Sequence, residues 1–146
     1  MAATDRYLRP GRGDRMLSNV ITGLTRVGVS VWGSRVLAVR GRSTGEWRTV
    51  PVNLLVLDGD RYLVAPRGVT QWVRNLRAAG GGELRVGRRV ETFTAVELDD
   101  DAKPAVLRAY LRKWKFEVGM FFDGVDATSD EALRQIAPGY PVFRIR

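Results

Sequence analysis

Residues 34–98 alternate short apolar runs with turn signals, and this pattern constrains the fold more than any other feature of the chain. In the segment WRTVPVNLLVLDGDRYLVAP, residues 47–66, apolar and polar side chains alternate as they do in strands. Asp58 and Gly59 interrupt the segment with a strong hairpin signal. Pro51 cannot donate to a sheet ladder, so an edge position or a bulge is expected there. Further strands are predicted at 34–41, 82–87, 89–98 and 140–146.

Because strand follows strand through hairpin turns, the sequence favours an antiparallel barrel or sheet over a doubly wound parallel sheet. Helices are predicted around it at 14–28, 70–80, 99–119 and 129–137. We therefore expect an α+β, mainly antiparallel fold of about six strands with peripheral helices. The length of 146 residues suits one domain, over 14–146, preceded by a flexible basic arm at 1–13.

The sequence contains no cysteine and no histidine. Disulfides, thiolate or imidazole metal sites, cysteine nucleophiles and Ser-His-Asp hydrolysis are therefore excluded. No metal site is expected, and an enzyme built from this chain needs something else, most simply a bound cofactor. Neither a signal peptide nor a run approaching ~20 apolar residues is visible. These features predict a cytoplasmic protein.

The formal net charge is +8, and the excess lies in residues 1–98, which hold 16 arginines and 8 acidic residues. Arginine suits bidentate binding of phosphate or carboxylate. The asymmetry indicates a polyanionic partner: a phosphorylated cofactor, an anionic membrane or a nucleic acid. A nucleic acid is not expected, because no recognised motif is present and aromatic residues are not interleaved with basic ones.

The predicted helix over 14–28 is amphipathic. Its apolar residues recur at helical spacing and are Met16, Leu17, Val20, Ile21, Leu24 and Val27. This apolar face, within residues 16–27, either packs on the domain, or touches the inner face of a membrane peripherally, or covers a lipophilic substrate.

The segment GRSTGEWRTVP, residues 41–51, links two predicted strands and is rich in hydrogen-bond donors. Its glycines permit unusual backbone conformations, so successive N–H groups can converge on an anion. Ser43 and Thr44 add hydroxyl groups, and Arg42 and Arg48 add charge. The segment is not a P-loop, because it lacks Gly-Lys-Ser/Thr and does not open a helix. It is either a phosphate-binding turn or an ordinary polar hairpin loop.

A second basic turn opens a predicted helix in APRGVTQWVRNLRA, residues 65–78. Arg67 and Gly68 lead into the helix start, where anions are favoured. Trp72 and Asn75 are three residues apart and share a helix face. An indole can wall a flat ring system and an amide can pair with its edge. The alternative is that Trp72 belongs to the core and Asn75 caps the helix.

Taken in order, GRSTGEWRTVPV, DGDRYLVAPRG, QWVRNLRA and YPVFRI resemble the deazaflavin-dependent nitroreductase family. The first motif of that family has the form Gly-Arg-Lys-Ser/Thr-Gly-x-x-Arg-x-x-Pro, and this chain departs from it at Ser43, where the family has Lys. The family's Trp-x-x-Asn-Leu is met by Trp72, Asn75 and Leu76. The resemblance covers residues 34–146 and implies a split β-barrel, like those of pyridoxamine oxidases and FMN reductases.

The resemblance implies binding of the deazaflavin coenzyme F420, whose phosphate and glutamate tail are anionic, with FMN in the same barrel as the alternative. Pro66-Arg67-Gly68 replaces the family's Ser-Lys/Asn-Gly-Gly, and Arg67 substitutes for the lost charge. The implied cofactor-binding residues are Arg42, Ser43, Thr44, Gly45 and Arg48 at the phosphate end, Pro51, Val52, Asn53, Ala65, Pro66, Arg67 and Gly68 along the ring, and Trp72 and Asn75 closing the site.

The activity that the resemblance implies is transfer of a hydride from reduced F420 to an electron-poor acceptor, such as a quinone, an enone or a nitro compound. Tyr140 precedes the last predicted strand and is the candidate donor of a proton or hydrogen bond, with plain packing as the alternative. A carrier that binds a deazaflavin or hydrophobic ligand without turnover also stays open. So does the choice between a monomer and a homodimer.

Overall fold

The structure, a computed structural model, describes residues 34–122 and 124–146. The predicted basic arm at 1–13 and the amphipathic helix at 14–28, with its apolar face at 16–27, lie outside the described residues and stay predictions.

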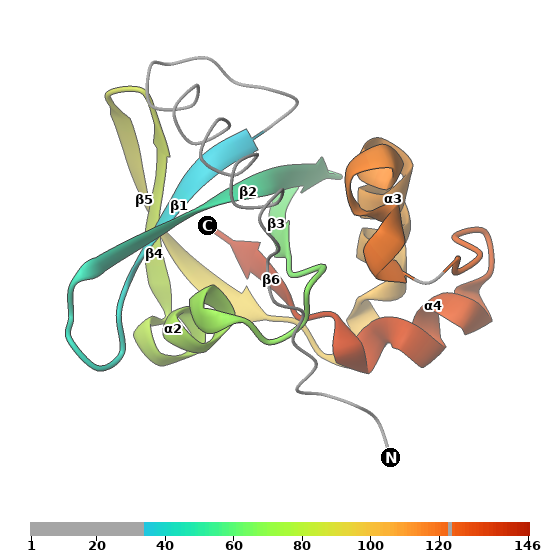
Figure 1. The fold of residues 1–146 in the computed structure, drawn as a ribbon. Helices are drawn as coiled ribbons and strands as arrows, with labels where there is room; N and C mark the ends of the chain where they lie inside the picture. The colour runs from blue at the N-terminus through green and yellow to red at the C-terminus, as the bar shows by residue number, and fades with distance from the viewer. Residues whose placement is uncertain (1–33, 123) are drawn as a thin grey trace.

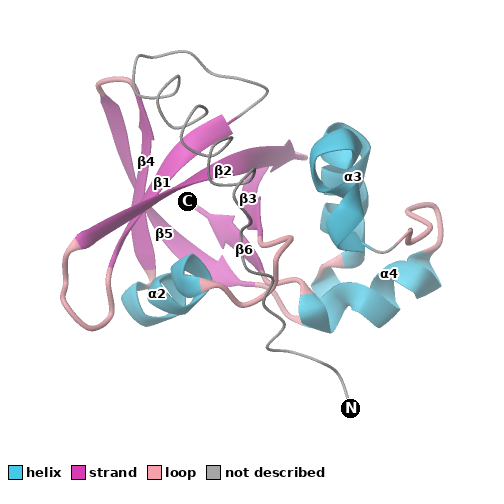
Figure 2. Ribbon diagram, in the orientation of Figure 1, coloured by secondary structure: helices cyan, strands magenta, loops and turns pink. Residues whose placement is uncertain are grey.

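Six antiparallel strands form a closed barrel in the order β1-β2-β3-β6-β5-β4 (Figures 1 and 2). Two features set this order: hairpins join β1 to β2, β2 to β3 and β4 to β5, and the C-terminal strand enters between β3 and β5. The antiparallel barrel with peripheral helices predicted from the sequence is thereby confirmed. The strands are β1 (Ser34–Arg40), β2 (Trp47–Leu57), β3 (Asp60–Val64), β4 (Gly81–Val86), β5 (Arg89–Glu97) and β6 (Val142–Ile145).

Strand β2 changes partners along its length. It pairs with β1 from Trp47 to Asn53 and with β3 from Leu54 to Leu57. Among the described strands, residues 47–53 therefore have a neighbour on one edge only. Pro51 lies in this segment, opposite Val36, where its missing N–H is tolerated as expected of an edge position. The barrel is split at this point.

Glycine is needed at two places in the barrel, in the turn between β2 and β3 and at the contact between β4 and β1. Asp58 and Gly59 both have positive φ, 52° and 82°, as a tight two-residue hairpin turn requires. A Cβ atom on Gly82 would lie 2.5 Å from the carbonyl oxygen of Ala38 in β1. This close approach of two backbones draws β4 against β1 and helps to close the barrel.

Two apolar clusters hold the elements together. The barrel cluster fills the inside of the strands, and α2 (Gln71–Ala79) adds Val73 and Leu76 to it from one end. In Figure 1 this helix lies beneath the barrel, next to the loop between β1 and β2. The buried members of the barrel cluster are Leu37, Val39, Leu54, Leu63, Ala65, Val69, Val73, Leu76, Leu84, Phe93, Phe143 and Ile145.

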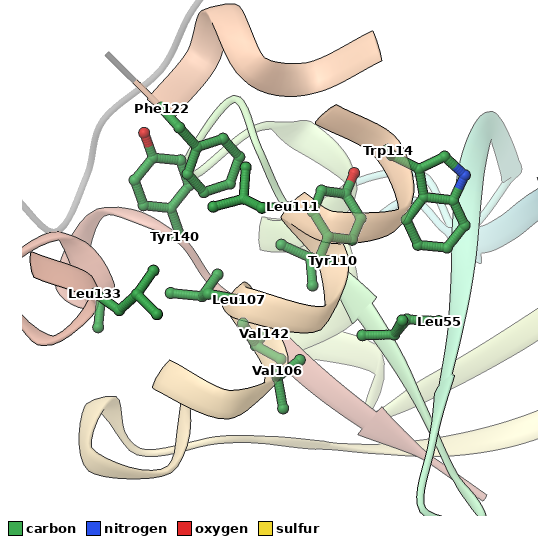
Figure 3. Packing of buried hydrophobic residues seen from close by; sticks show 12 residues of the cluster. Leu55, Val106, Leu107, Tyr110, Leu111, Trp114, Phe122, Leu133, Tyr140 and Val142 are labelled. Atoms are coloured by element: carbon green, nitrogen blue, oxygen red, sulfur yellow. The ribbon is translucent and has the colours of Figure 1, made fainter. Parts of the chain in front are cut away.

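The helix cluster lies between the outer face of β2, β3 and β6 and the helices α3 (Pro104–Val118) and α4 (Asp130–Ile136). Figure 3 shows its side chains, with Leu55 and Val142 from the sheet facing Val106, Leu107 and Tyr110 of α3. The two helices lie away from the β1–β2 loop, on the far side of the barrel (Figure 1). None of the helices within the described residues is long and apolar enough to cross a membrane.

The helix predicted from residue 99 begins at Pro104 instead. The preceding aspartates form a separate turn, η1 (Asp100–Ala102), because Pro104 has no N–H to donate to a preceding turn and suits the first position of a helix. The ammonium group of Lys103 is buried there, 2.6 Å from an oxygen of Asp100 and 3.0 Å from the carbonyl oxygen of Ala137. Two further short turns are η2 (Gly119–Phe122) and η3 (Ala137–Gly139).

Candidate functional site

The loop between β1 and β2, residues 41–46, is closed by its own hydrogen bonds. The N–H of Gly41 donates to the carbonyl of Glu46 at 2.8 Å, and the N–H of Gly45 donates to the carbonyl of Gly41 at 2.8 Å. The N–H of Glu46 donates to Oγ1 of Thr44 at 3.2 Å. The anion nest proposed for this loop is therefore smaller than its glycines suggest. Within the described residues, no acceptor pairs with the N–H groups of Ser43 and Thr44.

Arg42 ties this loop to helix α2. Its backbone N–H donates to Oδ1 of Asn75 at 3.2 Å, and its Nη1 donates to the same oxygen at 2.8 Å and to Oε1 of Gln71 at 2.9 Å. Asn75 is only 5% exposed. The amide of Asn75, expected to close a cofactor site, therefore acts directly on the loop instead of capping its own helix.

The other arginines around this loop are arranged differently. Arg48 lies on the exposed start of β2 and pairs with Glu46 at 3.7 Å. Arg40 donates to the carbonyl of Gly45 at 3.0 Å, and its guanidinium stacks 4.1 Å from the ring centre of Trp47. The loop thus presents three guanidinium groups within one short stretch of exposed chain, as the sequence predicted for Arg42 and Arg48.

The predicted ring-lining residues lie in two stretches, one on β2 and one between β3 and α2. Pro51, Val52 and Asn53 are half-buried on the open segment of β2. The pairing of β2 with β3 ends at Leu54 and Leu63, and after Val64 the chain leads into helix α2. That chain is the second predicted stretch, residues 65–68, in which Ala65 and Gly68 are buried and Pro66 and Arg67 half-buried.

Helix α2 begins directly after this stretch, without a side-chain cap. Thr70 holds the N-cap position, but its hydroxyl makes no capping bond, and its Oγ1 is buried with no hydrogen-bond partner. The first-turn N–H groups carry the positive end of the helix dipole. Trp72 is half-buried, with its ring 6.0 Å from that of Phe143 in the barrel cluster. Its indole therefore packs against the barrel cluster on one side and is partly exposed to solvent on the other.

Tyr140 lies in the helix cluster and is 4% exposed. Its ring stacks on Phe122 with centroids 4.3 Å apart and planes inclined by 9°, as Figure 3 shows. Its hydroxyl donates to the carbonyl oxygen of Phe121. The packing interpretation accounts for this placement, and the structure does not set Tyr140 beside the β1–β2 loop. Its connection to the candidate site runs through Phe121, whose ring lies 4.7 Å from the guanidinium of Arg67.

Two residues that contact the predicted site residues were not predicted from the sequence, Gln71 and Phe121. Gln71 precedes Asn75 by one helical turn, so both amides face the same way and meet Arg42. That spacing was visible, but nothing showed that a loop 29 residues earlier would reach it. Phe121 could not be found from spacing, because its contacts with Arg67 and Tyr140 join segments distant in the chain.

An ion pair crosses from one strand of the barrel to another, outside the candidate site. Arg61 on β3 and Glu91 on β5 lie 2.6 Å apart. The hydrogen bond from Arg61 is the main cause that holds the pKa of Glu91 below its ordinary value. The same bond raises the pKa of Arg61. Among the described residues, no group of three or more acidic side chains is placed to hold a metal ion.

The chain was compared with families of known proteins and with solved structures. Residues 18–120 match the family model described as F420H(2)-dependent quinone reductase. No protein of curated function matches the chain significantly in sequence.

Three solved structures share the fold. A structure of an F420-H2 dependent reductase, FDR-A, is 20% identical, with 82% of this chain and 100% of that chain covered and a TM-score of 0.54. A structure described as a domain-swapped dimer is also 20% identical, with 92% and 94% covered and a TM-score of 0.56. Atu2129 from Agrobacterium tumefaciens, of unknown function, is 15% identical, with 95% of this chain and 57% of that chain covered and a TM-score of 0.59.

Proposed function

Because the chain belongs to the F420H(2)-dependent quinone reductase family, we propose that it transfers a hydride from reduced F420 to an electron-poor acceptor, with quinones the first class to test. The match spans most of the chain and includes both stretches that form the candidate site. It carries the proposal, since the structural likenesses at 20% identity or below speak for the fold alone.

The residues at the split fit an anionic cofactor with a flat ring. Arg42 on the loop and Arg48 at the start of β2 are exposed, with the N–H groups of Ser43 and Thr44 between them in sequence. A few hydrogen bonds of this charge-assisted kind, each contributing about 1.5–3 kcal/mol, suffice for micromolar affinity. Together with Gly45 these residues would hold the phosphate end of F420. The orphaned, buried Oγ1 of Thr70 lies at the start of the neighbouring helix, where a polar ligand atom would satisfy it.

The open segment of β2 suits the ring. Pro51, Val52 and Asn53 would lie along one side of the ring, and residues 65–68 along the other. Trp72 would wall the site, and Asn75 would act through the loop that it anchors.

When bound, reduced F420 supplies the hydride, so the chain needs neither histidine nor cysteine for the chemistry. The protein's own contribution is to bind the cofactor by its anionic end, to orient the ring against the half-buried strand edge, and to bring the acceptor close. Arg67, held against Phe121 beside the site, carries a positive charge that would stabilise negative charge developing on a reduced acceptor oxygen.

The proposal is tested by mixing the purified protein with F420H2 and a soluble benzoquinone or naphthoquinone, and following the return of oxidised F420 by its absorbance. We expect turnover above the uncatalysed rate, and its loss in Arg42→Ala/Arg48→Ala. Parallel assays with an enone and a nitroaromatic rank the acceptors, and reduced FMN replaces F420H2 in a further arm. Binding of F420 without turnover of any acceptor would indicate a carrier and contradict the proposal.

A further inference from the structure

The guanidinium of Arg42 is held by neutral groups. Its Nη1 donates to the amide oxygens of Gln71 and Asn75, at 2.9 Å and 2.8 Å. Within the described residues, no carboxylate pairs with Arg42, and no acceptor meets its Nε or Nη2. The edge of the guanidinium that carries Nε and Nη2 is the one that matches two oxygens of a phosphate side by side.

Most other arginines with a described partner are paired with a carboxylate, so the arrangement at Arg42 differs from the usual one on this protein. The carboxylate pairs are Arg48 with Glu46, Arg61 with Glu91, Arg77 with Glu97, Arg85 with Glu83, Arg108 with Asp130 and Arg134 with Glu131.

Amide and carboxylate acceptors have different electrostatic consequences. Both fix the position of a guanidinium by hydrogen bonds, but a close carboxylate also offsets part of its charge toward any second anion. An amide oxygen orients the group and leaves the full positive charge available. Gln71 and Asn75 are one turn apart on the same helix, and Asn75 is buried. The helix therefore holds Nη1 from two sides while the Nε and Nη2 edge stays open.

We propose that Gln71 is a positioning residue, whose neutral amide aims Arg42 at the phosphate of the cofactor and preserves the charge that binds it. This inference rests on the proposed function, because it concerns the same phosphate. It extends the binding machinery to a side chain that is not among the predicted cofactor-binding residues, and it assigns a reason for glutamine instead of glutamate at this position.

The decisive variant is Gln71→Glu, which keeps the shape and the acceptor and adds one negative charge. A purely structural role predicts an unchanged or tighter contact with Arg42 and unchanged binding. A charge-preserving role predicts F420 binding weakened about tenfold or more, since the new carboxylate opposes the phosphate and neutralises Arg42. Gln135→Glu, on the exposed side of α4, is the matched control with the same change in net charge.

A second variant separates charge from position. In Gln71→Met the new side chain has a similar length, no charge and no amide acceptor. The hydrogen bond from Arg42 to Asn75 stays in place. We expect it to weaken F420 binding less than Gln71→Glu does, about two- to fivefold. Circular dichroism and melting temperature establish that both variants are folded.

The readout is a fluorescence titration with two ligands: F420, and the deazaflavin chromophore without its phosphate and tail. The expected result is a loss for Gln71→Glu with F420 alone, diminished at high salt because the groups are exposed. The charge-preserving role would be overturned by any of three results. Gln71→Glu could lose equal affinity for both ligands, it could bind F420 as tightly as the wild-type protein, or Gln71→Met and Gln71→Glu could lose equal affinity for F420. If the unaltered protein fails to bind F420, the proposed function fails instead, so the two failures are distinguishable.

Discussion

The docking of the β1–β2 loop on α2 predicts a measurable energetic coupling between Arg42 and Asn75. Asn75→Ala removes the acceptor of two hydrogen bonds, one from the backbone N–H of Arg42 and one from its guanidinium. A neutral hydrogen bond contributes about 1 kcal/mol, and a charged one about 1.5–3 kcal/mol when buried. Because the guanidinium is partly exposed, we take its contribution as about 1 kcal/mol and expect a total loss of about 2 kcal/mol.

A double-mutant cycle measures this coupling by combining Asn75→Ala with Arg42→Ala. The Arg42→Ala change deletes the guanidinium and keeps the backbone N–H. In that background, Asn75→Ala costs only the backbone hydrogen bond, about 1 kcal/mol. The coupling free energy between the two side chains is therefore about 1 kcal/mol. In a chain of this length the single Asn75→Ala change lowers the melting temperature by about 6 °C.

Urea denaturation of the four proteins, followed by tryptophan fluorescence and circular dichroism, measures these free energies. Equal slopes against urea establish that the variants share one unfolding transition. A coupling below about 0.3 kcal/mol, within the additivity expected of independent sites, would refute the view that the loop is anchored through Arg42 and Asn75.

Three further predictions concern the rest of the molecule. Gly82→Ala sets a Cβ against the backbone of β1 and should destabilise the fold by about 1–3 kcal/mol in urea, so an unchanged midpoint would contradict the close approach. Tyr140→Phe loses the hydrogen bond to Phe121 and should cost about 1 kcal/mol while turnover persists; a collapse of kcat in a folded variant would instead restore the proton-donor role. Arg61 holds the folded-state pKa of Glu91 below its ordinary value, so the stability that this pair contributes is present above the unfolded pKa and is lost as pH falls through the folded one. For this exposed pair we expect less than about 1 kcal/mol, seen as a wild-type advantage over Glu91→Gln in urea at neutral pH that disappears in acid; a pH-independent difference would contradict it.

The elements of the fold were predictable where their signals are local. Asp58-Gly59 gave the β2–β3 turn, because only a few residue types tolerate positive φ at both positions. Pro51 indicated an open strand edge, because it lacks an N–H. Closure of the barrel was not predictable from such signals. It depends on the contact between Gly82 and Ala38, and the position of Gly82 at the start of a predicted strand did not show which strand it would meet.

The candidate site divides in the same way. Arg42 and Arg48 were selected because glycines and hydroxyl groups surround them in one short turn, and their binding of a phosphate stays a prediction. The hydrogen bonds within the loop could not be predicted. The hydroxyl of Thr44 and the carbonyl of Glu46 accept from backbone N–H groups that the sequence suggested were available to a ligand. The role of Gln71 required the position of a helix relative to a loop, which tertiary packing alone determines.

The most direct test of the central claim is a fluorescence titration of the purified protein with F420, alongside Arg42→Ala/Arg48→Ala and the matched control Arg112→Ala/Arg134→Ala. The control removes the same two charges from exposed positions on α3 and α4. We predict micromolar or tighter binding by the wild-type protein and the control, and a loss of about a hundredfold or more in the loop variant. Absence of F420 binding by the wild-type protein, or equal affinity in all three, would contradict the claim that the β1–β2 loop binds the phosphate of the cofactor.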